Sequence, residues 1–241
     1  MKLRRILLAV LGVLLVSAVV ASRIASGLYW DQHAISTTLI DVQYPDNQAL
    51  VFKSDIEPLV NTFLKESKDS NMLKANVFLL ETSIEALPYV DEAQVYWNLN
   101  EALVVKVRSK QAKAKVLIGK DMHLMTTGNE ILLPPTSVAL NLPIITGASD
   151  SASAAAIGLV LDEVYASTVF DETNVAQLAV EGDRVKLVPE AYEHTITANA
   201  GPLLGRDLEK LAAFYAATEK EELEQISRID LRFSNQVVTE L

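Results

Sequence analysis

Histidine, serine and carboxylate side chains are the groups of this sequence that could carry catalysis or bind a metal. The three histidines, His33, His123 and His194, lie far apart. None belongs to the His-Glu-x-x-His pattern that places two zinc ligands on one helix face. Asp150, His194 and a serine would form a hydrolase site only if the fold brought them into one pocket. An exported hydrolase with a dispersed active site is therefore one hypothesis.

Glycine-rich stretches do not match the loops of known catalytic sites. Gly147-Ala148-Ser149 continues into Asp150-Ser151, so it lacks the second glycine of a nucleophile elbow. Gly201 and Gly205 are followed by Arg206-Asp207, where a phosphate loop has lysine with serine or threonine. These stretches predict a loop and a helix entry.

Paired carboxylates could share acid and base roles, as in sugar hydrolysis. Asp162-Glu163 and Glu221-Glu222 are such pairs, but adjacent positions of a helix point apart. They are interpreted as solvated helix faces. We therefore expect no enzyme activity, no cofactor and no metal.

Composition excludes several partners and chemistries. The chain has 31 acidic and 21 basic residues and a formal net charge of -10, opposite to the basic surface that nucleic-acid backbones select. It has no cysteine, which excludes disulfides, thiol catalysis and thiolate metal sites. Its 241 residues suffice for a membrane anchor and two small domains.

The first thirty residues predict a membrane anchor. Lys2, Arg4 and Arg5 precede an apolar run over 6–21, and Arg23 interrupts before a second run that ends at Trp30. A helix over 6–29 is long enough to cross a bilayer if Arg23 snorkels toward water. Because basic flanks stay cytoplasmic, everything after the anchor is expected outside the cytoplasm.

A cleaved signal peptide is the alternative interpretation of this segment. Val19, Val20 and Ala21 before Ser22 are small or modest residues at which a peptidase could cut. The remainder is exported in both cases, so only its attachment to the membrane differs.

The residues from Ser36 onward predict a compact α+β unit in which three strands cover one face of two helices. Ser54 and Glu57 have the spacing of a capping box, and Pro88 ends the second helix. The expected elements are a strand over 38–44, a helix from Ser54, a helix over 76–86, and strands over 93–99 and 102–107 joined by Asn100-Glu101.

A mainly antiparallel β domain with helices is expected after this unit. The turn Glu181-Gly182-Asp183 separates two strands of a meander, and Leu208, Leu211, Ala212 and Tyr215 share one face of a helix. The expected elements are a helix over 152–168, strands over 175–180, 184–188 and 193–198, a helix from Gly205, and closing strands over 227–233 and 236–239.

Two stretches resemble the FtsQ/DivIB family of bacterial cell-division proteins. Residues 80–90, continued by Ala93, Val95 and the strand 103–107, resemble its POTRA domain. The helix over 205–215 and residues 229–235 resemble its C-terminal signature. Residues 114–116, Gly128 and 142–147 fall between them in the family's order, so the resemblance spans nearly the whole chain.

The sequence also departs from the family pattern. Asn100 and Ala112 stand where the family usually has prolines. Thr126 and Thr127 stand where an acidic residue often precedes a small turn, and Phe233 replaces a more usual tyrosine.

The resemblance implies an α+β fold with an N-terminal transmembrane helix, a POTRA-like βααββ domain and an FtsQ-type β domain. The implied limits are 1–32 for the cytoplasmic stub and anchor, 33–110 for the POTRA-like domain and 111–241 for the β domain. It also implies a single-pass protein of the cell inner membrane at the division septum, with a cytoplasmic N-terminus and periplasmic domains.

The resemblance further implies a non-enzymatic divisome scaffold with no small-molecule substrate. A terminal strand can leave one row of backbone groups unpaired, which a partner strand completes. In the family this region resembles the surface that receives FtsB, with FtsL alongside, while the POTRA-like domain recruits upstream proteins. The implied contact residues are Phe233, Ser234, Asn235, Gln236, Val237, Val238 and Thr239. A fully internal terminal strand is the alternative.

An envelope chaperone or translocation module is the alternative function, since POTRA-like units also bind extended polypeptides by strand addition. Such proteins usually carry several repeats or a barrel, and this sequence shows one repeat. Septal enrichment in dividing cells favours the scaffold, whereas uniform envelope staining favours the chaperone.

Overall fold

The structure is a computed structural model that describes residues 15–24, 37–45, 48–66, 76–100, 102–135 and 140–241. Residues 15–24 are helical. No helix within these ranges combines the length and the apolar character needed to span a bilayer. Most of the anchor predicted over 6–29, and also His33 and Glu101, lie outside the described residues.

The chain forms two compact units. Unit 1 comprises Met1–Pro45 and Val51–Ser109, and unit 2 comprises Asp46–Leu50 and Lys110–Leu241. Each has its own cluster of buried apolar residues. The predicted domain limits, 33–110 and 111–241, refer to parts of the chain that each fold independently. Compact packing does not test independent folding, so these limits stay a prediction.

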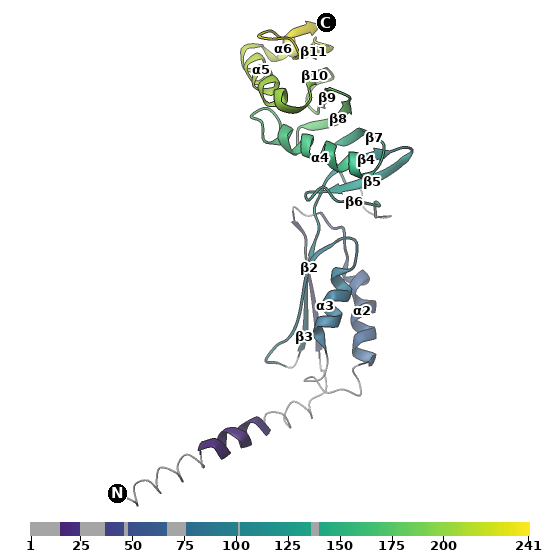
Figure 1. Cartoon of the computed structure of the whole chain (residues 1–241), viewed down its shortest axis with the longest axis vertical. Helices are drawn as coiled ribbons and strands as arrows, with labels where there is room; N and C mark the ends of the chain where they lie inside the picture. The colour runs from purple at the N-terminus through teal and green to yellow at the C-terminus, as the bar shows by residue number, and fades with distance from the viewer. Residues whose placement is uncertain (1–14, 25–36, 46–47, 67–75, 101, 136–139) are drawn as a thin grey trace, which may run out of the picture. The chain divides into compact units, whose positions relative to one another are not determined.

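Unit 1, as described, packs two helices against a three-stranded sheet (Figure 1). Its elements are β1 (Thr37–Gln43), α2 (Lys53–Glu66), α3 (Val77–Glu85), β2 (Val90–Trp97) and β3 (Ala102–Ser109). The middle strand β3 runs parallel to β1 and antiparallel to β2. The predicted order of strand, helix, helix, strand, strand is therefore observed.

The core of unit 1 forms because both helices turn an apolar stripe toward the sheet. Ile56 and Val60 on α2, and Leu80 and Ile84 on α3, are at most 3% exposed. Each pair is four residues apart and so lies on one helix face. They pack with strand residues such as Val105. Burial of one such side chain contributes about 1.5–3 kcal/mol, so these contacts are what dock the helices.

The predicted start of the first helix is wrong. The helix begins at Lys53, so Ser54 lies within its first turn and does not cap it. Instead, the Asp55 carboxylate accepts a hydrogen bond from the N–H of Phe52 at 2.8 Å, and the N–H of Asp55 donates to the Phe52 carbonyl at 2.9 Å. This reciprocal pair closes the turn two residues earlier than the predicted capping box. The first strand also ends one residue early, at Gln43.

Unit 2, as described, contains one mixed nine-stranded sheet with the order β12-β11-β10-β9-β8-β7-β4-β5-β6. Helices α4 and α5 pack against it and against each other (Figure 1). The elements are β4 (Ala112–Ile118), β5 (Asp121–Thr126), β6 (Ile131–Leu132), β7 (Ile144–Ala148), α4 (Ser151–Tyr165), β8 (Val175–Glu181), β9 (Arg184–Pro189), β10 (Thr195–Asn199), η3 (Gly201–Leu203), α5 (Leu204–Ala217), α6 (Lys220–Leu223), β11 (Arg228–Asp230) and β12 (Val238–Glu240).

The predicted antiparallel meander corresponds to β8, β9 and β10. The described sheet also contains three parallel pairs, β4 with β7, β7 with β8, and β10 with β11. A parallel connection has to cross the sheet, and α4 makes the crossing between β7 and β8, as α5 and α6 do between β10 and β11. The sheet is therefore mainly antiparallel, with parallel pairs that local sequence patterns do not predict.

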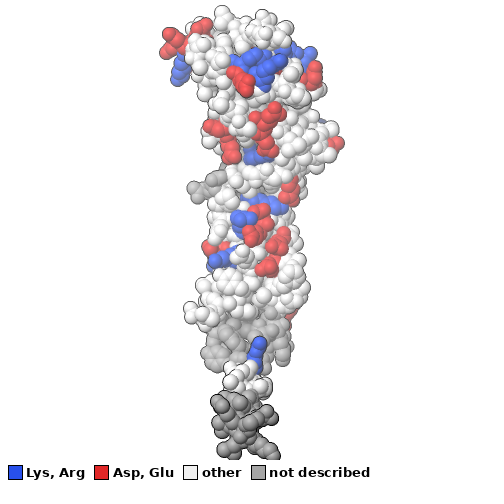
Figure 2. All heavy atoms as spheres, turned by 60° about the vertical axis from the view of Figure 1, so that its left-hand side comes forward, with Lys and Arg blue, Asp and Glu red and all other residues white. Residues whose placement is uncertain are grey.

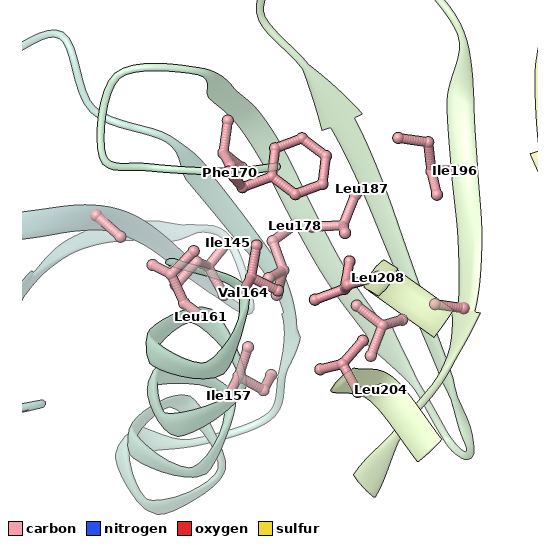
Figure 3. Packing of buried hydrophobic residues seen from close by; sticks show 14 of the residues in the cluster. Ile145, Ile157, Leu161, Val164, Phe170, Leu178, Leu187, Ile196, Leu204 and Leu208 are labelled. Atoms are coloured by element: carbon pink, nitrogen blue, oxygen red, sulfur yellow. The ribbon is translucent and has the colours of Figure 1, made fainter. Parts of the chain in front are cut away.

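The core of unit 2 lies between these helices and the sheet. Figure 3 shows Ile145, Leu178, Leu187 and Ile196 on neighbouring strands, facing Ile157, Leu161 and Val164 of α4 and Leu204 and Leu208 of α5. All nine are at most 6% exposed. This continuous apolar layer holds β10 and α5 in place, and the edge of the sheet is built on them.

Candidate functional site

β12 is the last strand at one edge of the unit 2 sheet. Among the described residues it pairs only with β11, with Ile229 opposite Thr239. The carbonyl of Glu240 faces β11, because it accepts the N–H of Ser227 at 2.8 Å. Backbone groups alternate along an antiparallel strand, so the N–H and C=O of Thr239 face away from the sheet. Such unpaired groups are what an added strand requires.

The seven predicted contact residues lie on β12 and on the connection that leads into it. Val238 and Thr239 belong to the strand. Phe233 and Val238 are 46% and 39% exposed, whereas Val237 packs against the core. The remaining three, in the connection, are Ser234, Asn235 and Gln236. The fold brings all seven together at one edge, and their contact with a partner stays a prediction.

The two closing strands are shorter than predicted. β11 ends at Asp230 instead of Phe233, and β12 begins at Val238 instead of Gln236. Asn235 has φ 59°, a left-handed conformation that asparagine tolerates in turns. The predicted strands over 227–233 and 236–239 are therefore wrong in extent, because residues 231–237 form the connection between them.

Lys210 on α5 holds the start of this connection in place. Its Nζ donates to the backbone carbonyls of Leu231 and Phe233, the latter at 2.9 Å. It also lies 3.0 Å from Oδ1 of Asp207, a fully buried carboxylate. Asp207 Oδ2 accepts from the backbone N–H of Asn199 at 2.9 Å and from its side-chain amide at 2.7 Å. This polar network links α5, β10 and the connection to β12.

Asp230 and Arg232 explain why β11 stops where it does. Arg232 donates through Nε to Oδ1 of Asp230 at 2.9 Å and through Nη2 to Oδ2 at 2.6 Å. The backbone N–H of Arg232 also donates to Oδ1 of Asp230, at 3.1 Å. This N–H is therefore bound by a side chain and not by a neighbouring strand. The side-chain hydrogen bonds from Arg232 hold the pKa of Asp230 below its usual range.

Sequence reasoning missed Lys210, Asp207 and Asn199. The only local signal is the spacing of Asp207 and Lys210, which places opposite charges three residues apart on one helix. That spacing is common on solvated helices and does not indicate a buried pair.

The residues of the hydrolase hypothesis contact different partners. Asp150 caps α4 by accepting the N–H of Ser153 at 2.7 Å, and these bonds keep the pKa of Asp150 low. His194 lies instead within 2.6 Å of the Tyr215 hydroxyl through Nε2, and its ring stacks on Tyr192 at 5.1 Å. Asp150 contacts a serine and His194 contacts tyrosines, so these contacts do not bring the three groups of the hydrolase hypothesis together.

The His194 side chain is fully buried. Burial lowers the pKa of His194, although the Leu223 backbone carbonyl opposes this shift. Burial also raises the pKa of Tyr215, with a contribution from Tyr192. Both groups are thus uncharged at neutral pH, as an internal packing contact requires.

The other candidate groups occupy structural positions. Asp162 pairs with Lys113, whose side chain is 4% exposed, and accepts the Asn129 amide at 3.1 Å. Glu221 and Glu222 are exposed on the short helix α6. Within the described ranges, no three His, Asp or Glu side chains are arranged to hold a metal ion.

Comparison with known proteins relates this sequence to one family. Residues 114–240, slightly more than half of the 241 residues, match the family model described as "FtsQ/DivIB, C-terminal related". No curated protein matches the chain. Among solved structures, the major extracytoplasmic domain of the trans isomer of the bacterial cell division protein DivIB from Geobacillus stearothermophilus is similar, with 13% identity and a TM-score of 0.33. That match covers 45% of this chain and 93% of the other.

Proposed function

Because the chain belongs to the FtsQ/DivIB family, we propose that it is a non-enzymatic scaffold of the division machinery that binds other division proteins through the edge formed by β12. The proposed partners at this edge are FtsB and FtsL. The observation that carries the proposal is the outward N–H and C=O of Thr239 on a strand that pairs only with β11 among the described residues.

Backbone pairing alone does not account for stable binding. β12 has three residues, and each added hydrogen bond contributes about 0.5–1.5 kcal/mol. Stable interfaces bury about 1,200–2,000 Å² in total, far more than one short strand offers. The exposed side chains of Phe233 and Val238 beside the edge supply apolar surface for the remainder. The partner is thus expected to combine a short strand with an apolar contact.

Long-range electrostatic steering plays a minor part in this proposal. Figure 2 shows acidic and basic side chains close together on the visible face of the chain. Near the edge, Arg228 pairs with Glu240 at 3.4 Å, and Arg232 pairs with Asp230 at 2.6 Å. Because each of these pairs places opposite charges side by side, the edge itself has no strong field of one sign, and short-range contacts are expected to set the specificity.

The proposed setting is the cell inner membrane at the division septum, with the N-terminus in the cytoplasm and residues 33–241 in the periplasm. Lys2, Arg4 and Arg5 before the apolar run over 6–21 support this orientation. The mass of the protein extracted from membranes tests retention of the anchor. A mature chain that starts at Ser22 would show that the segment is a cleaved signal peptide.

Co-purification tests the partner-binding edge. Phe233→Ala in the full-length chain removes apolar surface at the edge and is expected to reduce recovery of FtsB and FtsL from mildly solubilised membranes. Leu159→Ala is the matched control, because Leu159 on α4 is 64% exposed and lies outside the predicted contact residues. Equal recovery with wild type and Phe233→Ala would remove this residue from the proposed interface.

A further inference from the structure

The outer edge of β2 in unit 1 is covered by side chains of α3. Among the described residues, β2 pairs only with β3. The N–H of Val95 donates to Oε2 of Glu81 at 2.8 Å, and the N–H of Ala93 approaches Oε1 of Glu85 at 3.5 Å. These two outward N–H groups are the donors that an added strand would use, and carboxylates already occupy them.

The spacing of the two elements makes this cover possible. Glu81 and Glu85 are one helical turn apart, a rise of about 6 Å along α3. Ala93 and Val95 are two residues apart, a rise of about 7 Å along β2. Because α3 and β2 run in opposite directions, the earlier glutamate meets the later strand residue. The distance between Glu81 and Glu85 along α3 therefore matches the distance between Ala93 and Val95 along β2.

We propose that Glu81 and Glu85, here called the edge guard, close β2 to strand addition, and that without them β2 pairs with β2 of a second copy of this chain. A carboxylate forms a stronger hydrogen bond to an N–H than a neutral carbonyl does, so an incoming strand is a weaker competitor. The shorter contact of Glu81 makes it the principal member of the guard.

A second copy is the partner because β2 is self-complementary in an antiparallel arrangement. If Gln94 lies opposite Gln94 of the second copy, Ala93 lies opposite Val95, and Glu92 lies opposite Tyr96. The outward N–H groups of Ala93 and Val95 then form the hydrogen-bonded pairs, and no like charges face each other. The same surface is used by both copies, as a twofold dimer requires.

Disulfide cross-linking tests the guard in the full-length chain. The chain has no cysteine, so Gln94→Cys introduces a single reactive thiol on β2. In the proposed register the two residues at position 94 form a non-hydrogen-bonded pair with Cα atoms about 4.5 Å apart, which suits a disulfide. The combination Glu81→Ala, Glu85→Ala and Gln94→Cys is expected to raise the cross-linked fraction in oxidised membranes by about tenfold over Gln94→Cys alone.

Two further variants separate the guard from general effects of charge or folding. Glu57→Ala with Glu66→Ala removes two carboxylates from α2 and is expected to leave the cross-linked fraction at the level of Gln94→Cys alone. Glu81→Gln with Glu85→Gln keeps an oxygen acceptor on each side chain and is expected to keep cross-linking low. Cross-linking that does not rise in the alanine pair, or that rises equally in the α2 control, overturns the proposal.

Amide hydrogen exchange gives an independent readout that does not need dimerisation. The Val95 amide is expected to exchange faster in Glu81→Ala, and more so in the alanine pair, than in the wild type or the α2 control. If exchange accelerates while the chain stays monomeric and uncross-linked, Glu81 and Glu85 merely tether α3 to the sheet, and the guard is rejected. Exchange that is equal in all variants also rejects it.

Discussion

The Nζ of Lys210 donates a hydrogen bond to the backbone carbonyl of Phe233 at 2.9 Å, so a charged side chain of α5 fixes the backbone of a residue whose own side chain is 46% exposed. The contact joins the buried core to the connection before β12. Stability and the geometry of the edge are therefore coupled through one lysine.

Lys210→Met is expected to destabilise unit 2 strongly. The change leaves the fully buried Asp207 carboxylate without its cation, which costs about 3–5 kcal/mol of the free energy of unfolding. The double variant Asp207→Asn with Lys210→Met removes both charges and is expected to lose less than the single one. Urea unfolding of the three proteins measures the difference. A loss below about 1 kcal/mol in the single variant would show that Asp207 is not a buried charge.

Acidification is expected to destabilise the protein through His194. Its folded-state pKa lies below the ordinary value of 6.5, so the unfolded chain binds the proton more readily. The free energy of unfolding therefore falls as the pH drops below 6.5 toward the lowered folded-state pKa. Well above 6.5 the group is neutral in both states and contributes no slope.

His194→Gln tests this assignment, since glutamine can still hydrogen-bond the Tyr215 hydroxyl but does not titrate. Denaturant midpoints between pH 8 and pH 5 are expected to vary less in this variant than in the wild type. His123→Gln is the control, because His123 is partly exposed on β5. If the stability of His194→Gln depended on pH as steeply as that of the wild type, the pH dependence would belong to other groups.

Gly147→Ala is expected to disrupt the sheet at β7. Gly147 has φ 96°, and a Cβ there would lie 2.3 Å from the carbonyl oxygen of Val180. Strained backbone and a backbone clash together predict a loss of about 3 kcal/mol or more. At Gly182, φ is 62° but no atom lies within 4 Å of a Cβ, so Gly182→Ala is expected to cost only about 1 kcal/mol. Thermal unfolding compares the two, and equal losses would contradict the clash.

Elements built from local patterns could be predicted from the sequence. The apolar stripe of Leu80 and Ile84 produces a helix close to its predicted limits. The predicted hairpin is also present, although β2 runs over Val90–Trp97 and not over the predicted 93–99. These features depend on neighbours within a few residues of the chain. The same holds for the meander around Gly182.

Features that depend on distant contacts could not be predicted in this way. The end of β11 is set by Arg232, which binds Asp230, and by Lys210 on α5, more than twenty residues earlier. The pairing of β4 with β7 joins strands between which β5 and β6 lie in the sequence. The alternating apolar residues Ile229, Leu231 and Phe233 indicate a strand but not where its ladder stops, because Lys210, distant in the sequence, binds the carbonyls of Leu231 and Phe233.

Proline substitution along β12 distinguishes its outer edge from its paired edge. The N–H of Thr239 faces outward, so Thr239→Pro removes a donor from the partner without breaking a bond to β11. Its free energy of unfolding is expected to change by less than about 1 kcal/mol, while co-purification of FtsB is lost. Val238 lies opposite Asp230 and its N–H faces β11, so Val238→Pro is expected to weaken both the fold and the binding. Thr239→Ala retains the N–H and should bind as the wild type does, whereas FtsB recovery with Thr239→Pro at the wild-type level would mean that the partner does not pair with this edge.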